Sequence, residues 1–481
     1  MSPVDTLLHS YLDLARLLDP MQHPDEAPAD ADARLGRFDV PWLTAQLAAL
    51  RSIANAIEDL EDVEERDDEV DRTMLLDTVR GDIARLQFLT EGPTTDPVLP
   101  LRHAAVALDA LLGEDFDVER AQALAARIGE LPEMLALVRE DTRPAPAFLV
   151  EAASVAVEHL EERLDLAAER LDNVAVLGAA RTSLEDHRRW LRDALDSDGE
   201  VGLGEDAVLP RLALLNNEPF GVKATLRLLE LRRAGAERAL HTAAEDLGYG
   251  DDWSAALEAL PELSPLDPFE RLDAWLDEWE RAGSVYITLG LGVPDAEPGL
   301  APNVDDRATL AVWAMRARAR AMFEAARATQ ERPVRRLLVA DGIRRGWSRA
   351  VVALLRDTPL LAAPEHLLAA AWLALLDAVA AETDLMLASR LATPEELVTR
   401  AGEIAHLDET RARALVVMVA EEPLAALAAG LSHAGWAAWH ADEGGDPAQF
   451  LHKALGAGGL AVPLARWVLT PDDGFAEDEQ G

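Results

Sequence analysis

Residues 367–386 read "LLAAAWLALLDAVAAETDLM", and their pattern decides the fold class. The side chains that recur every three or four positions are mostly apolar: Leu368, Trp372, Leu375, Val379, Thr383 and Met386. This spacing puts them on one face of an α-helix, which turns once every 3.6 residues. A second stretch has the same spacing, at Val150, Ala153, Val157, Leu160 and Leu164. Together with abundant Ala, Leu, Arg and Glu, all good helix formers, these stripes predict a mainly α protein.

The length and composition indicate a globular chain with a large core. It has 481 residues, of which 49% are hydrophobic and 28% are charged, an ordinary balance for a folded protein. We predict one multi-helix body over residues 1–470, with a mobile loop at 20–36 and a disordered acidic tail at 471–481. The stretch "SVYITLGLGVP" (284–294) is β-branched and glycine-rich, which predicts a small β element beside the helices.

The charge and the missing cysteines exclude several classes of function. A net charge of −43 repels nucleic acid and anionic membranes, so we expect neither as a partner. The chain has no cysteine, which excludes disulfides, thiolate catalysis and cysteine metal sites and fits a reducing cytoplasm. The first residues show no signal-peptide pattern, and charges interrupt the apolar runs before about 20 residues. We therefore predict a cytoplasmic protein without a membrane span.

Two clusters have the composition of cation sites. The acidic run "EDLEDVEERDDEVD" (58–71) is more typical of a solvated helix face or a turn between helices. Near the C-terminus, imidazole and carboxylate groups gather at His433, His440, Asp442, Glu443 and His452. Trp436 and Trp439 lie among them, which favours core packing over metal binding. We predict no metal at either cluster.

Several segments, in order, resemble a known family. They include "YITLGLGVPDAEPGLAPNV" (286–304), "RRGWSRAVVALLRD" (344–357) and "FLHKALGAGGLAVPL" (450–464). In sequence order and approximate spacing the chain is similar to the bacterial family called domain of unknown function 885. This resemblance implies a zincin-like, metallopeptidase-like architecture, in which a large helical body has a small sheet beside the active-site helix.

The departures from that family fall on its metal ligands. Its His-Glu-x-x-Pro-Gly-His stretch corresponds here to residues 330–335, where Gln330 and Arg335 replace the histidines and only Glu331 survives. Arg345 replaces the glutamate of a Glu-Gly-Trp-Ala helix, and Ala388 replaces a later histidine. Arginine has no lone pair to give a metal and stays protonated. The resemblance therefore implies a degenerate site with neither metal nor cofactor.

Arginines crowd the same region. Residues 316–356 contain eleven arginines but only three carboxylates, Glu324, Glu331 and Asp341. One interpretation is a site for a small anionic ligand or peptide, because guanidinium forks bind carboxylate and phosphate well. The candidate residues are Arg332, Arg335, Arg336 and Arg345. The other interpretation, favoured in so acidic a chain, is that these arginines form ion pairs with the protein's own Asp and Glu residues.

Three functions stay open on the sequence alone. The leading prediction is a non-catalytic relative of the peptidase-like family, a pseudoenzyme with a binding role. The second is a metal-independent hydrolase in which Glu331 is the general base, although no nucleophile is evident. The third is a helical module that binds a protein partner.

Overall fold

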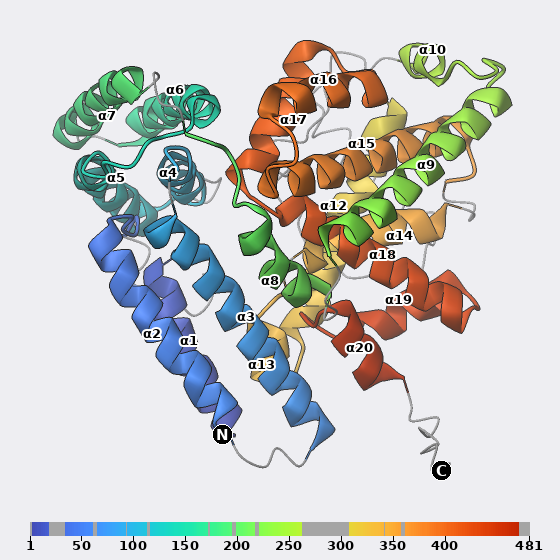
Figure 1. Ribbon diagram of the computed structural model, residues 1–481, viewed down its shortest axis with the longest axis horizontal. Helices are drawn as coiled ribbons and strands as arrows, with labels where there is room; N and C mark the ends of the chain where they lie inside the picture. The colour runs from blue at the N-terminus through green and yellow to red at the C-terminus, as the bar shows by residue number, and fades with distance from the viewer. Residues whose placement is uncertain are drawn as a thin grey trace. The chain divides into compact units, whose positions relative to one another are not determined.

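The computed structural model confirms the predicted fold class (Figure 1). Every regular element in the described part of the chain is a helix. The described residues are 2–18, 34–60, 65–92, 94–112, 116–171, 174–194, 199–216, 221–261, 307–340, 342–356 and 361–470. The predicted strand at 284–294, the acidic tail at 471–481 and most of the loop predicted at 20–36 lie outside them.

The contact pattern groups the chain into two compact units, where the sequence predicted one body over 1–470. Unit 1 comprises Met1–Glu61, Leu75–Val208 and Leu387–Pro394. Unit 2 comprises Asp62–Met74, Leu209–Met386 and Glu395–Gly481. The boundaries fall within helices α3, α8 and α15, so part of each of these helices belongs to either unit.

Unit 1 is built on amphipathic helices that bury one face each. The predicted stripe of α6 is confirmed, because Val157, Leu160 and Leu164 are fully buried. Aspartate caps begin two of the helices: Asp39 accepts the backbone N–H of Trp42, and Asp117 caps the start of α5, as expected at an N-cap. The helices of this part are α1 (Pro3–Leu18), α2 (Val40–Glu58), α3 (Arg66–Glu91), α4 (Leu99–Asp109), α5 (Val118–Val138), α6 (Ala147–Arg170), α7 (Val174–Ala194) and α8 (Glu205–Asn216).

Unit 2 contains the region that the sequence marked as a candidate site. Its centre is α14, which packs against α12 and α18. The first turns of α3 also belong to this unit. Its helices are α9 (Val222–Asp246), α10 (Trp253–Glu258), α12 (Arg307–Ala328), α13 (Pro333–Leu337), α14 (Ile343–Leu355), α15 (Pro364–Ala388), α16 (Pro394–Ala405), α17 (Glu409–Glu421), α18 (Ala425–Glu443), α19 (Pro447–Leu455) and α20 (Val462–Leu469).

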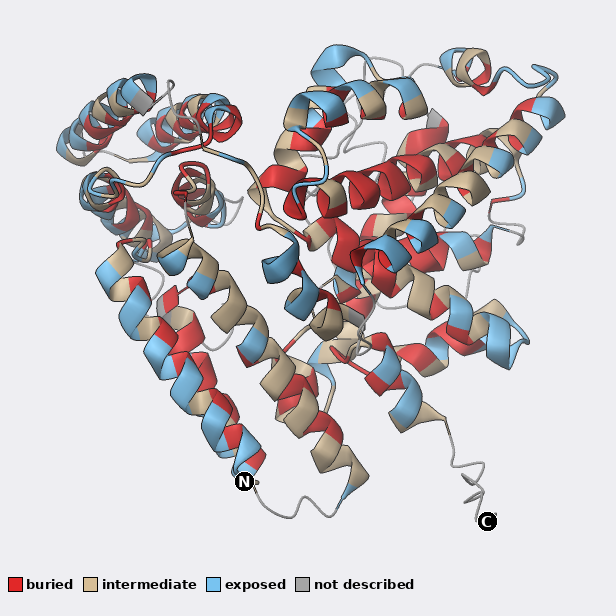
Figure 2. Ribbon diagram, viewed as in Figure 1, coloured by how far each residue is buried: buried red, intermediate tan, exposed pale blue. Residues whose placement is uncertain are grey.

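Helix α15, which contains the opening stretch, is buried on nearly every face (Figure 2). Leu368 and Leu375 of the predicted stripe are fully buried, and so are Ala369 and Ala380 on other faces. A helix apolar all round is typical of a core or of a membrane span. Its length and composition would allow a span, contrary to the sequence expectation, and so would the bent pair α17 and α18 taken together. Because 72% of its most apolar window is buried inside the protein, these properties fit a central core helix.

An aromatic cluster fixes one face of α14. The ring of Trp347 packs edge-on against Trp436 at 5.3 Å, and Trp436 stacks on Trp439 at 5.6 Å. The indole N–H of Trp347 donates to the carbonyl oxygen of Ala319 at 3.0 Å. All three tryptophans are about 1% exposed, so Trp436 and Trp439 belong to the core as predicted, and Trp347 does so too.

Two glycines bring α14 into backbone contact with α18. A Cβ atom at Gly346 would collide with the side chain of Ser432, and one at Gly342 would collide with the backbone of Ala428. Gly342 also has a φ of 74°, a left-handed conformation that glycine adopts without strain. Larger residues at either position would push the two helices apart, so their spacing is fixed.

Candidate functional site

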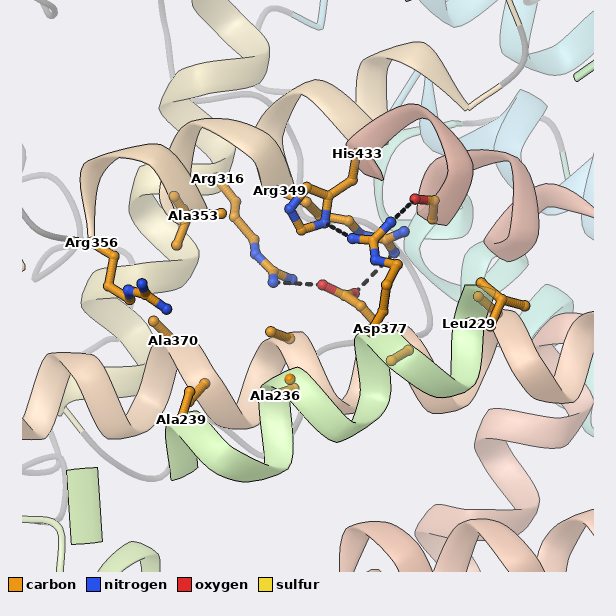
Figure 3. A pocket seen from close by; sticks show the side chains of 18 residues that line it. Leu229, Ala236, Ala239, Arg316, Arg349, Ala353, Arg356, Ala370, Asp377 and His433 are labelled. Atoms are coloured by element: carbon orange, nitrogen blue, oxygen red, sulfur yellow. Dashed lines mark hydrogen bonds and ion pairs between the residues drawn. The ribbon is translucent and has the colours of Figure 1, made fainter. Parts of the chain in front are cut away.

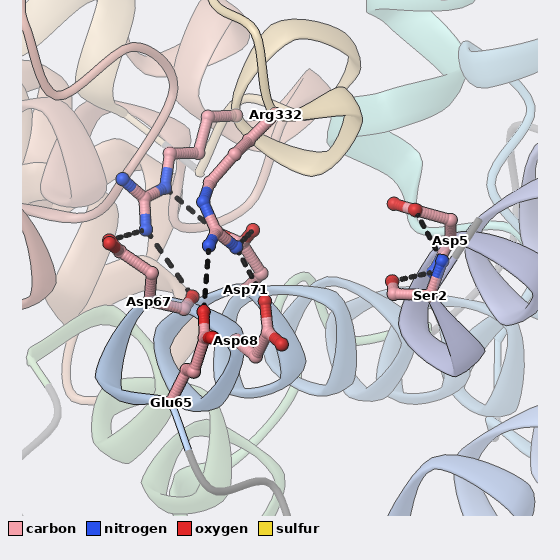
Figure 4. A network of polar contacts seen from close by, with 8 residues as sticks. Ser2, Asp5, Glu65, Asp67, Asp68, Asp71 and Arg332 are labelled. Carbon is pink, nitrogen blue, oxygen red and sulfur yellow. Dashed lines mark hydrogen bonds and ion pairs between the residues drawn. The ribbon is translucent and has the colours of Figure 1, made fainter.

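Two of the four arginines predicted to bind an anion, Arg332 and Arg335, are held by aspartates of the same unit. Arg332 pairs with Asp68 at 2.6 Å and with Asp71 at 2.9 Å (Figure 4). Arg335 pairs with Asp71 at 2.8 Å and with Asp67 at 2.5 Å. We call these five residues the α3 arginine cluster. The alternative interpretation, ion pairs with the protein's own carboxylates, therefore describes Arg332 and Arg335.

The acidic run at 58–71 is correspondingly not a purely solvated face. The side chain of Asp71 is only 6% exposed and that of Arg335 only 7%. A hydrogen bond from Arg335 lowers the pKa of Asp67, against the opposing effect of its partial burial. The run extends from the end of α2 into the first turns of α3, in line with the predicted position between two helices. Asp71 is nevertheless buried, because the first turns of α3 pack against α13, which is far away in sequence.

The remaining positions of the degenerate site do not join that cluster. Arg345 pairs with Glu422 at 3.0 Å, so Arg335 and Arg345 bind different carboxylates. Glu331 is exposed on the turn before α13, and Gln330 and Arg336 are intermediate in exposure. Ala388 belongs to unit 1, and its carbonyl oxygen accepts the backbone N–H groups of Leu203 and Gly204, each at 2.8 Å.

The C-terminal imidazole and carboxylate groups also have separate partners. Glu443 accepts from Trp439 and from Lys453, each at 2.6 Å. Asp442 pairs with Arg466 at 2.7 Å. Within the described ranges, no three His, Asp or Glu side chains come together in a way that could hold a metal ion.

A pocket in unit 2 gathers a different set of arginines (Figure 3). Its volume is about 250 Å³, and its lining comes from α9, α12, α14, α15 and α18. Four guanidinium groups but one carboxylate line it, together with one imidazole: Arg232, Arg316, Arg349, Arg356, Asp377 and His433. We call this the arginine pocket.

Asp377 is shared by two of these arginines. Its carboxylate accepts from Arg316 at 2.6 Å and pairs with Arg349 at 3.0 Å. Asp377 and Arg349 are 8% and 5% exposed. The Nη1 atom of Arg349 is buried and has no hydrogen-bond partner in the described part of the chain, and the same holds for Nε of Arg316. Buried charged donors without acceptors are costly, so an acceptor brought by a ligand would stabilise these two groups.

Arg232 has no carboxylate at ion-pair distance among the described residues. Its guanidinium donates to the carbonyl oxygen of Gly430 and to Nδ1 of His433. Burial, followed by the charge of Arg349, lowers the pKa of Arg232 to about 10. Burial and three neighbouring arginines hold the pKa of His433 well below its ordinary value. His433 is therefore neutral at neutral pH, and the pocket keeps a positive charge.

The rest of the pocket wall is apolar and made of small side chains. It includes Ala236 and Ala239 of α9, Ala353 of α14, and Ala370 and Ala374 of α15. Methyl side chains neither fill the space between the helices nor offer hydrogen bonds. The arrangement can therefore hold an anion at its charged end and an apolar group along its wall.

The sequence analysis found the arginine surplus, but the four candidate arginines that it named do not line this pocket. A signal was available in the helical neighbours three and four positions away. For Arg232 these are Leu228, Leu229, Gly235 and Ala236, none of which can pair with it. Arg349 likewise has no carboxylate at those positions. An arginine on an apolar helix face must find its partner elsewhere in the fold or in a ligand.

Comparison with known proteins supports the fold and gives no activity. No family model matches the sequence, and no curated protein matches it. A solved structure called "putative lipoprotein" from Colwellia psychrerythraea is similar, with a TM-score of 0.77 and 12% identity over 97% of this chain and 98% of that one. A "putative lipoprotein of unknown function" from Shewanella oneidensis has a TM-score of 0.68 and 11% identity over the same shares. At this identity the likeness shows the shared helical fold alone.

Proposed function

We propose that this protein is a non-catalytic helical binding protein that holds a small organic anion in the arginine pocket. The observation that carries the proposal is the shortage of carboxylates in one pocket: Arg316 and Arg349 share Asp377, and Arg232 has no carboxylate at ion-pair distance among the described residues. The proposed anion site therefore differs from the one predicted at residues 332–345 and lies in another part of unit 2.

The physical reason is the cost of burying like charges together. Guanidinium groups repel one another in a partly dry pocket, and one carboxylate does not neutralise three of them. A bound carboxylate or phosphate supplies negative charge and several acceptor lone pairs at once. The unpaired Nη1 of Arg349 then gains the acceptor that it lacks.

The other predictions on function stay predictions. Glu331 is exposed, and a substrate screen comparing the wild type with Glu331→Ala tests the metal-independent hydrolase. The family resemblance, the interaction module and the cytoplasmic location likewise stay predictions. The lipoprotein name belongs to the two structural neighbours.

Titration calorimetry with acetate, benzoate and inorganic phosphate tests the proposal. We expect at least one of these anions to bind the wild type, and Arg232→Met to weaken that binding at least tenfold. Loss of a charged hydrogen-bond donor typically costs about 1.5–3 kcal/mol, which corresponds to this factor or more.

Arg227→Met is the matched control. Arg227 lies on the same helix, its side chain is 71% exposed, and its partner is Glu230. It should bind anions as the wild type does. If no anion binds the wild type, or if both variants lose affinity equally, the proposed function is wrong.

A further inference from the structure

We infer that the ligand of the arginine pocket is a single-chain amphiphilic anion. Its charged head lies at Arg232 and Arg349, and its apolar chain lies along the small side chains of α9 and α15. The inference rests on the proposed function, because it assigns the ligand class of the same pocket.

The pocket has a buried charged end and an exposed mouth. Arg349 and Asp377 are nearly completely buried, whereas Ala353 and Arg356 are exposed. Arg349 and Arg356 are seven residues apart along α14, which is roughly 10 Å along the helix axis. Figure 3 shows Arg349, Asp377 and His433 together, and Arg356 apart from them beside Ala353 and Ala370. The charged head of a ligand therefore reaches Arg232 and Arg349 only if it enters the pocket ahead of the apolar chain.

The wall between the two ends suits a methylene chain. Its small residues come from facing helices: Ala236 and Ala239 on α9, and Ala370, Ala374 and Ala378 on α15. A wall of small residues provides space but does not by itself identify the ligand. The occupant's orientation follows from a second observation, the buried and unpaired Nη1 of Arg349 at the inner end.

The volume limits the length of the chain. The pocket measures about 250 Å³, and one water molecule in the liquid takes up about 30 Å³. The space thus holds on the order of eight water-sized groups. A carboxylate with a straight chain of about eight carbons in total is a ligand of this size.

Titration of the full chain with straight alkanoates tests the inference: acetate, butanoate, hexanoate, octanoate and decanoate. We expect the affinity to rise about fourfold for each added methylene and to stop rising near octanoate. Octanol, which lacks the charge, should not bind. A second titration uses octyl phosphate, which has the same chain length as octanoate. If it binds more tightly than octanoate, the head group of the ligand is a phosphate.

Two variants narrow the wall without touching the charged end. Ala374→Leu and Ala353→Leu should weaken octanoate binding at least tenfold and leave acetate binding unchanged. Ala353 is exposed, so its substitution should not disturb folding. Ala438→Leu, at an exposed position of α18 outside the pocket lining, is the matched control and should bind octanoate normally.

The outcomes separate this inference from the proposed function. An affinity that does not change with chain length, while acetate still binds, overturns the amphiphilic ligand and keeps the anion site. Octanol binding as tight as octanoate binding also overturns it. Absence of binding for every anion overturns both.

Discussion

Two arginine groups in unit 2 differ in how many carboxylates they meet. In the α3 arginine cluster, two guanidinium groups bind three aspartates at 2.5–2.9 Å. In the arginine pocket, Arg316 and Arg349 share Asp377, and Arg232 donates to Gly430 and His433 instead of to a carboxylate. The residue type is the same in both places, so the number of local acceptors separates a structural ion-pair cluster from a candidate binding site.

This difference has opposite consequences for stability. In the first group both arginines share the buried Asp71, so removing it leaves them with only the more exposed Asp67 and Asp68 as partners. In the second group the charges already repel one another, so removing one of them relieves repulsion. The predictions below use these opposite signs, from the largest expected effect to the smallest.

The largest expected effect is that of Asp71→Ala. Asp71 pairs with both Arg332 and Arg335, and the side chain of Arg335 is 7% exposed. Breaking a buried pair in this way typically costs about 3–5 kcal/mol of the free energy of unfolding. Urea denaturation followed by tryptophan fluorescence measures it, since Trp347, Trp436 and Trp439 are buried in the same unit.

Glu422→Ala is the control for that variant. Glu422 also pairs with an arginine, Arg345, but the two side chains are 34% and 38% exposed. Pairs in contact with solvent contribute about 0–1 kcal/mol. Equal destabilisation by the two substitutions would show that burial does not distinguish the α3 arginine cluster from a surface pair.

The next effect concerns a buried carboxylate that forms no ion pair with any described residue. Asp384 accepts the backbone N–H groups of Leu424 at 2.7 Å and Leu427 at 3.0 Å. Burial raises its pKa to about 7, against those bonds and the charge of Arg345. The folded protein therefore holds this proton more tightly than the unfolded chain, in which the pKa is near 3.8. The protonated Asp384 therefore adds its full contribution to the free energy of unfolding below about pH 4, and this contribution is lost as the pH rises to 7.

Between pH 5.5 and pH 7 this loss amounts to about 1.6 kcal/mol, because the slope falls from 1.36 kcal/mol per pH unit to half of that at the folded-state pKa. Urea midpoints measured across that range for the wild type and for Asp384→Asn isolate it from the other carboxylates. The variant should show a shallower fall in stability with rising pH. Parallel curves would mean that Asp384 ionises in the folded protein as it does in the unfolded chain.

The smallest expected effect has the opposite sign. Arg232→Met removes one of the clustered guanidinium charges of the pocket and keeps a side chain of similar length. Replacing buried ionic groups by well-packed apolar groups of similar volume is often neutral or stabilising, by up to about 1–4 kcal/mol, and here the removed charge is one that its neighbours repel. We expect the free energy of unfolding to rise by about 1 kcal/mol, the lower end of this range, because the substitution also removes the hydrogen bond from Arg232 to Gly430. A clear fall in the thermal midpoint would show that Arg232 is structural, as Arg335 is.

The helices were predictable because their signal is local. The buried stripe of α6 and the core position of Trp347 follow from residues within a few turns. The near-complete burial of α15 was harder to predict, because Asp377, Glu382 and Asp384 interrupt its apolar run. Each of them finds a partner in the fold: Glu382, for example, pairs with Arg233 at 2.9 Å and Arg400 at 2.8 Å.

The site was predictable only in part, because charge balance in a folded protein is set by distant residues. The surplus of arginine at 316–356 was visible in the sequence. The partners of Arg335 come from α3, more than 260 positions away in the chain, so the sequence did not reveal which arginines are neutralised. Arg232 lies outside the arginine-rich stretch altogether, and only the packing of α9 beside α15 and α18 adds it to the pocket.

The glycine contacts between α14 and α18 have a consequence for how a ligand would be received. Because Gly342 and Gly346 hold the two backbones together, Arg349 on one helix and His433 on the other keep a fixed separation. A rigid receptor loses little conformational entropy on association. The ligand would bind a preformed pocket, so calorimetry and spectroscopy should detect binding in a single step, with no slow rearrangement of the helices.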